Sequence, residues 1–323
     1  MDPRISDFIL TFSGVLWEAM PFIVLGAVVA GILEEFLPQQ AITKFLPKAA
    51  VPAVMIGALL GLIFPMCECG ILVVMRRLLR KGLPLSCCIA YMLAGPVINV
   101  VVIFSTWVAF KDFGLGAEMV GLRVGLAFIV ACVTALIVHV QYAKHGNALL
   151  TRTAIPPAMP AADADPDAPP PARGSVMTRL GNISATALHD FVDITVFLIL
   201  GAVLAAVAKQ NISPDQIETL SRDQPFLAIP AMMLLAVVMC LCSEADAFVA
   251  ASFTNMHLSA KLAFLVLGPM LDLKLILMFT RVFRPRLILT IALSTTILVF
   301  TLTILVHLIY QANGWSGLPA VAR

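Results

Sequence analysis

The sequence predicts an all-α polytopic membrane protein made of two homologous halves. Three observations support this fold class: an apolar composition, a series of long apolar runs, and a motif order that occurs twice. Of the 323 residues, 60% are hydrophobic and 12% are charged, whereas about half of a typical soluble domain is apolar and about a quarter is charged. This composition excludes an ordinary soluble domain and predicts a multi-pass protein surrounded by a lipid bilayer.

Eight apolar runs each reach the roughly 20 residues that cross a bilayer core. In chain order they are residues 8–33, 51–75, 83–110, 120–140, 188–208, 226–251, 258–280 and 287–309. Between the fourth and fifth runs lies a polar stretch rich in Ala, Pro and Asp, which buries too little surface to fold. The sequence therefore predicts a first membrane repeat over residues 1–142, a flexible cytoplasmic linker over residues 143–187 and a second membrane repeat over residues 188–323.

The two halves carry the same features in the same order. When the second half is laid on the first at one constant offset, without a gap, three features align: Cys67 with Cys240, Gly95-Pro96 with Gly268-Pro269, and Asn99 with Asp272. A slightly larger offset upstream aligns Glu18 with Asp193. Internal duplication is typical of secondary transporters, which bind substrate where the repeats meet. The sequence therefore predicts one central site built by both halves.

Basic residues indicate how the halves are oriented, because they favour the cytoplasmic side. In the first half they lie at residues 76–81, after the C-x-C segment, and in the second half at residues 281–286, after the Gly-Pro segment. Both clusters and the linker share one side if each C-x-C segment is a broken or re-entrant helix and the repeats, of four membrane segments each, are inverted, and this is the arrangement that we expect. Pro65 and Gly70 would supply the first break. Eight full spans with parallel repeats are the alternative.

Polar side chains inside apolar runs are candidates for function, because each is costly in the bilayer. The candidates for substrate binding are the four C-x-C cysteines and two polar residues that follow the Gly-Pro breaks: Cys67, Cys69, Cys240, Cys242, Asn99 and Asp272. Thiolates suit copper(I), zinc and other thiophilic ions. If the two breaks meet, the four cysteines form a metal site for a transported ion; the alternative is that they only pack.

Carboxylates near the same breaks are candidates for proton coupling. They are Glu68, Glu244, Asp246, Glu18 and Asp193. A carboxyl group in apolar surroundings exchanges a proton closer to neutral pH than one in water does. As an alternative, Glu68 pairs with Arg76 or Arg77, and Asp272 is neutralised by Lys274. The Gly-Pro breaks at Gly95-Pro96 and Gly268-Pro269 would free backbone carbonyls toward a cavity.

Five stretches of the chain carry a family resemblance: FPMCECGI, RRLLRKGLPLS, AGPVIN, CSEADAFVAASF and LVLGPMLDLKLILM. They resemble a family of bacterial predicted permeases, UPF0718-like and YraQ-like, that includes the organoarsenical efflux permease ArsP and members named copper/zinc efflux transporters. The resemblance covers nearly the whole chain. It implies a permease of the bacterial inner membrane in which Cys67, Cys69, Cys240 and Cys242 are the motif cysteines.

The expected function is secondary-active efflux of a thiophilic metal ion or a trivalent arsenical. One alternative is transport of a sulfur or thiol compound, with the cysteines exchanging sulfur or a disulfide. Another is a membrane thiol oxidoreductase or an integral subunit of a larger complex. The sequence has no phosphate-binding loop with a lysine, no Ser-His-Asp constellation and no basic patch suited to nucleic acid. We therefore expect no catalytic residues and no cofactor, and an oligomer remains an open option.

Overall fold

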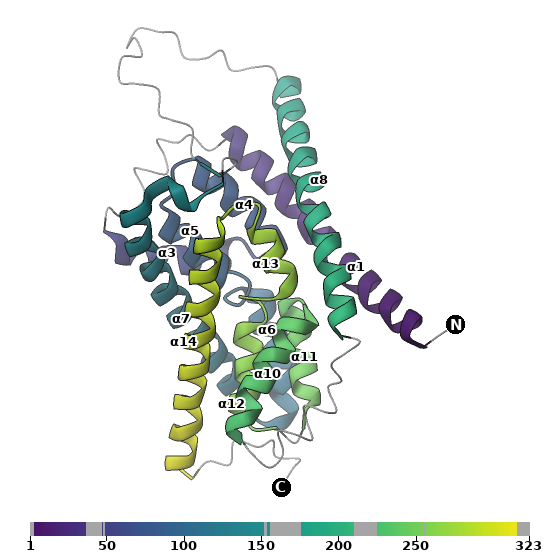
Figure 1. The fold of residues 1–323 in the computed structure, drawn as a ribbon, viewed down its shortest axis with the longest axis vertical. Helices are drawn as coiled ribbons and strands as arrows, with labels where there is room; N and C mark the ends of the chain where they lie inside the picture. Colours follow the sequence, from purple (N-terminus) through teal and green to yellow (C-terminus); the bar gives the residue numbers. More distant parts are fainter. Residues whose placement is uncertain are drawn as a thin grey trace.

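A computed structural model of the chain describes residues 3–36, 47, 49–151, 154–155, 176–209, 225–254 and 256–314, which are nearly all helical (Figure 1). Among these residues, four helices are long and apolar enough to cross a membrane: α1 (Pro3–Phe36), α7 (Gly116–His145), α8 (Val176–Lys209) and α14 (Pro285–Ala312). The prediction of an α-helical protein with several helices of membrane-spanning length is confirmed.

The other four apolar runs form pairs of short helices instead of continuous spans. In the first half they are α3 (Ala50–Ile63), α4 (Glu68–Arg80), α5 (Leu85–Ala94) and α6 (Val100–Phe110). In the second half they are α10 (Pro225–Met239), α11 (Ser243–Ser252), α12 (Leu258–Leu267) and α13 (Leu273–Phe279). At 1.5 Å per residue, each is shorter than a hydrocarbon core of about 30 Å. The short 3-10 helices η1 (Lys111–Phe113) and η2 (Gly146–Leu149) flank α7.

The two broken C-x-C segments lie toward opposite ends of the molecule. Figure 1 shows α3, α4 and α5 in the upper half of the view, whereas α10, α11 and α12 lie in the lower half. The chain descends from α5 to α6 in the first half and ascends from α12 to α13 in the second. The helix breaks therefore lie near the middle of the molecule, between its two ends.

Two glycines on the long helices allow close packing near these breaks. α1 packs against α4, and α8 packs against α13. A Cβ on Gly26 would lie 2.9 Å from the Cα of Gly70, and a Cβ on Gly201 would lie 2.7 Å from the Cα of Lys274. Gly70 therefore lies inside α4, where it admits α1, and the prediction that it forms part of the helix break is wrong; the break precedes Glu68.

The predicted linker over residues 143–187 is more ordered at its ends than expected. α7 continues to His145, and α8 already begins at Val176. Between them, Leu150 forms an isolated antiparallel bridge with Phe283, and further backbone hydrogen bonds flank this bridge. The start of the linker is therefore fixed to the segment that joins α13 to α14. The centre of the linker, residues 156–175, lies outside the described residues.

Candidate functional site

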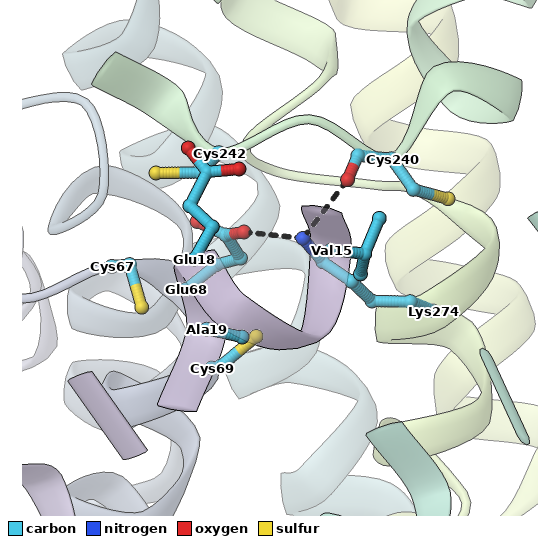
Figure 2. A pocket seen from close by; sticks show the side chains of 9 residues that line it. All are labelled: Val15, Glu18, Ala19, Cys67, Glu68, Cys69, Cys240, Cys242 and Lys274. Atoms are coloured by element: carbon cyan, nitrogen blue, oxygen red, sulfur yellow. Dashed lines mark hydrogen bonds and ion pairs between the residues drawn. The ribbon is translucent and has the colours of Figure 1, made fainter. Parts of the chain in front are cut away.

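Both C-x-C motifs line one small cavity in the interior (Figure 2). Its walls come from α1, the start of α4, the turn between α10 and α11, and α13. The lining residues are Val15, Glu18, Ala19, Cys67, Glu68, Cys69, Cys240, Cys242 and Lys274. Segments of both halves, far apart in the sequence, therefore contribute to a single site, whose cavity volume in this conformation is only about 10 Å³, room for about one water molecule.

The first C-x-C motif lies at the N-terminus of α4. After α3 ends at Ile63, Pro65 lies in the non-helical turn, and Cys67 precedes α4 in an extended conformation (φ −69°, ψ 167°). Glu68 and Cys69 form the first turn of α4, and all three motif residues are at most 2% exposed. The helix start thus directs two thiols and a carboxylate toward the cavity.

The second C-x-C motif has a different backbone. Cys240 adopts a left-handed conformation (φ +50°), the only non-glycine residue to do so in the described ranges, and such a conformation is unfavourable for a residue with a Cβ. Cys242 is extended and precedes α11, and its thiol donates a hydrogen bond to Glu244. The sharp turn at Cys240 directs its carbonyl oxygen toward Lys274, whose ammonium donates to it over 3.2 Å.

A buried ion pair joins the two halves at the cavity. The Lys274 ammonium lies 2.7 Å from Oε1 of Glu68 and 3.5 Å from Oδ2 of Asp272. Each of these three residues is at most 2% exposed. The expectation that Glu68 pairs with Arg76 or Arg77 is therefore wrong, because its partner is Lys274 (Figure 2).

Asn99 and Asp272 cap helices at the Gly-Pro breaks. The Asn99 side chain accepts a hydrogen bond from the Val102 amide over 2.8 Å at the start of α6. The Asp272 side chain accepts one from the Leu275 amide over 2.6 Å at the start of α13. Neither residue lines the cavity, so the structure places them as supports of the breaks, with Asp272 reaching the site only through Lys274.

Asp193 lies in a different place from Glu18, although the two align when the halves are superposed in sequence. Glu18 lines the cavity, whereas Asp193 accepts a hydrogen bond from Arg76 over 2.8 Å and another from Arg281. Asp190, one turn earlier on α8, binds both Arg76 and Arg77. The expected coupling role for Asp193 at the central site is therefore not supported, because its carboxylate is neutralised by Arg76 in the C-terminal half of α4 and by Arg281 just after α13.

Glu244 and Asp246 follow the second C-x-C motif but do not line the cavity. Asp246 is fully buried, and its Oδ2 has no hydrogen-bond partner. Nearby, the buried Arg123 of α7 donates to the Ser243 carbonyl oxygen over 3.1 Å and to Thr106 Oγ1 over 2.7 Å. Sequence reasoning missed Arg123, although a lone arginine within the apolar run 120–140 was the available signal.

The cysteines do not form a ready metal site in this conformation. All seven are free thiols. Within the described ranges, no group of three or more His, Cys, Asp or Glu side chains is arranged to hold a metal ion. The cavity therefore brings the four motif thiols to one place without converging them on a single point, so the predicted four-sulfur site would need movement of the two turns.

Sequence comparison places the chain among membrane transport proteins. A family model described as a predicted permease, ArsP_1, matches residues 4–310. The chain belongs to this predicted permease family. The family resemblance of the five sequence stretches is thereby confirmed, and the chain is a multi-pass membrane permease by family and by its membrane-length helices.

Two bacterial relatives of this permease cover almost its whole length. The UPF0718 protein YcgR of Bacillus subtilis is 35% identical over 91% of the chain and 95% of its own length. A putative two-component membrane permease complex subunit of Streptococcus mutans is 32% identical over 91% of the chain and 93% of its own length. No solved structure matches the chain.

Proposed function

We propose that this permease is a secondary-active transporter of the bacterial inner membrane that exports a thiophilic metal ion or a trivalent arsenical through the C-x-C cavity. The observation that carries the proposal is that both motifs, far apart in the sequence, line one interior cavity with Glu68 and Lys274. Thiols are soft ligands, and a buried polar site between two halves is where secondary transporters bind substrate.

The charges of the cavity support a cargo that is a cation or carries a hydrogen-bond donor. Oε2 of Glu68 is buried and has no hydrogen-bond partner, and leaving such an acceptor unsatisfied is unfavourable. Glu18 adds a second carboxylate at the same cavity. A cargo bound by the thiols would reach the free oxygen of Glu68 and satisfy it.

We also propose that residues 1–142 and 188–323 are inverted repeats. The linker start contacts the segment after α13 through the Leu150–Phe283 bridge. Arg281, in that segment, shares Asp193 with Arg76, which lies in the C-terminal half of α4. These contacts support one common face for the linker and both basic clusters, as inverted repeats require and parallel repeats with eight full spans do not.

Labelling tests the orientation directly. Arg284 lies beside the start of the linker, because its amide donates a hydrogen bond to the Leu149 carbonyl oxygen. An R284C variant should therefore react with a membrane-impermeant thiol reagent in inside-out vesicles and stay unlabelled in intact cells. Labelling from outside the cell contradicts the inverted arrangement. The wild-type chain is the background control, since six of its seven cysteines are buried.

Transport by purified protein in liposomes tests the cargo. Zn²⁺, copper(I) and arsenite are offered separately, with and without an imposed proton gradient, to wild type, to C67S/C69S and to C240S/C242S. We expect movement of at least one probe by the wild type and its loss in both double variants, because each motif supplies half of the thiols. C132S, which lies outside the cavity, is the matched control and should transport like wild type.

A sulfur or thiol compound is the second candidate cargo. It is favoured by the separate hydrogen bonds of the second motif, in which the Cys240 thiol donates to the Val237 carbonyl oxygen and the Cys242 thiol to Glu244. A cargo held through one sulfur at a time needs no convergence of these thiols. Flux separates the candidates: if a thiol is the cargo, wild-type liposomes should move cysteine or glutathione itself, and the C240S/C242S variant should not. Because one relative is named as a complex subunit, the same assays should be repeated on protein purified with whatever remains bound to it.

A further inference from the structure

The Lys274 ammonium is surrounded by oxygen atoms from three separate segments. Glu68 Oε1 comes from α4, the Cys240 carbonyl oxygen from the turn before α11, and Asp272 Oδ2 from the cap of α13, at 2.7, 3.2 and 3.5 Å. Carboxylates together with the carbonyls of interrupted helices are the ligands that transporters use for free monovalent cations. The position of the ammonium is thus a cation site that the chain fills with its own side chain.

We propose that Lys274 is a built-in cation: its ammonium occupies, in the empty permease, a site that otherwise takes a free monovalent cation. In transport, Lys274 would leave Glu68 when cargo enters the cavity, and this part of the proposal rests on the proposed function. With Lys274 back on Glu68, no free monovalent cation has to fill this site while the empty permease returns.

The backbone around the lysine is shaped for this arrangement. The left-handed conformation of Cys240 directs its carbonyl oxygen toward the ammonium. Gly201 lets α8 lie directly on the backbone of Lys274, since a Cβ there would come within 2.7 Å of its Cα. The strained backbone of Cys240 and the close contact at Gly201 both hold the Lys274 side chain in one position. A lysine that only packs in the interior does not require such features.

The charge count at the site explains why a cation is needed. Glu68 and Asp272 are both buried, and one oxygen of each lacks a hydrogen-bond partner. Removing one partner of a buried ion pair leaves an uncompensated charge, which is strongly unfavourable. Without the ammonium, the protein gains stability by binding any small cation that fits among the remaining oxygens.

The purified full-length chain with a K274M substitution tests this proposal without any transport assay. Its unfolding midpoint, Tm, is measured in NaCl and in choline chloride at equal ionic strength. We expect NaCl to raise the Tm of K274M saturably by about 5 °C relative to choline, because Na⁺ enters the vacated site and choline is too large. The wild type, whose site holds Lys274, should show the same Tm in both salts.

Two further variants make the result specific. E68Q/K274M removes the carboxylate together with the lysine and should lose the sodium response. K261M removes another buried lysine, which lies over the rings of Phe110 and Phe113 at 5.8 Å, and should respond to neither salt. The proposal fails if K274M responds no more to NaCl than to choline chloride, if K261M responds equally, or if K274M cannot fold in either salt.

The two levels of the proposal fail separately. If wild type moves none of Zn²⁺, copper(I) and arsenite while K274M binds Na⁺, the proposed function is wrong and the cation site stands. If wild type moves arsenite, K274M should do so at least tenfold more slowly in choline chloride than in NaCl, whereas wild type should not distinguish the salts. Equal arsenite flux of K274M in both salts contradicts the role of Lys274 in the return step.

Discussion

The two C-x-C turns have the same cysteines but opposite charge surroundings. The central residue is Glu68 in the first motif and Leu241 in the second, and the first-half residue that aligns with Lys274 is Val101, which is 51% exposed. The first half therefore supplies the acid of the central ion pair, and the second half supplies the base. Two identical halves would bring two like charges to one cavity, so a site shared between similar halves requires such divergence.

The long helices α1 and α8 show the same division. In the alignment that pairs Glu18 of α1 with Asp193 of α8, Val15 corresponds to Asp190. The two residues of α1 line the cavity, whereas the two of α8 bind arginines of α4 and of the segment after α13. The same two aligned positions thus line the cavity in the first half and form ion pairs with arginines in the second half.

The largest expected effect comes from neutralising Glu68. E68Q removes the closest partner of Lys274, and loss of one member of a buried pair costs about 3–5 kcal/mol. We expect the free energy of unfolding, measured by urea denaturation in detergent, to fall by about 3 kcal/mol and arsenite flux to be abolished. L241Q, at the matching position of the other turn, should keep most of the stability and most of the arsenite flux. Equal losses in E68Q and L241Q would contradict the different roles of the two turns.

The second prediction compares the acidic residues of α8, which form ion pairs, with Glu18 of α1, which lines the cavity. Asp190 is 1% exposed and binds two arginines, so D190N should lower the free energy of unfolding by about 3 kcal/mol. Asp193 is 13% exposed, and D193N should cost about 1 kcal/mol because partial solvation weakens an ion pair. E18Q should leave stability within about 0.5 kcal/mol and slow transport. A transport defect in D193N without a stability change would instead restore a coupling role for Asp193.

Much of this architecture could be predicted from the sequence because it depends on local chemistry. Apolar runs give helices, Pro65 and Pro96 lie at interruptions, and the duplicated motif order predicted that the two C-x-C segments contribute to one site. Gly70 was misassigned, because a glycine in an apolar run serves equally as a break or as a close contact, and only the position of Gly26 on another helix decides which.

The ion-pair partners could not be predicted, because they depend on how distant segments meet. Arg76 and Arg77 are near Glu68 in the sequence, yet α4 carries them to the far end of the helix, where α8 supplies Asp190. Lys274 follows Asp272 closely, which suggested a local pair; its shortest contact is to Glu68 of the other half. Eight residues along one helix separate two side chains by about 12 Å along its axis, whereas packing of the two halves brings together residues that are far apart in the sequence.

The third prediction concerns a feature that the two halves share. G26A introduces a methyl group 2.9 Å from the Gly70 backbone and should cost about 1–3 kcal/mol through overpacking. G201A should cost a similar amount, because its new Cβ meets the Lys274 backbone at 2.7 Å. G14A on the same helix as Gly26 meets nothing within 4 Å and should be neutral or stabilising by up to about 1 kcal/mol. Unfolding midpoints in urea measure all three; a neutral G26A contradicts the close approach of α1 to α4.

The smallest expected effect compares the two helix caps. N99A removes one capping hydrogen bond at α6 and should cost about 1 kcal/mol. D272A removes the equivalent cap at α13 together with a carboxylate 3.5 Å from Lys274, so its cost should exceed that of N99A. D272N separates the two contributions, because asparagine caps as well as aspartate does and carries no charge. If D272N matches wild type in stability, the charge of Asp272 contributes nothing beyond capping, and the difference between Asp272 and Asn99 has no electrostatic role. If D272N loses stability and the reciprocal variant N99D does not, a charge is needed at the cap of the second half alone.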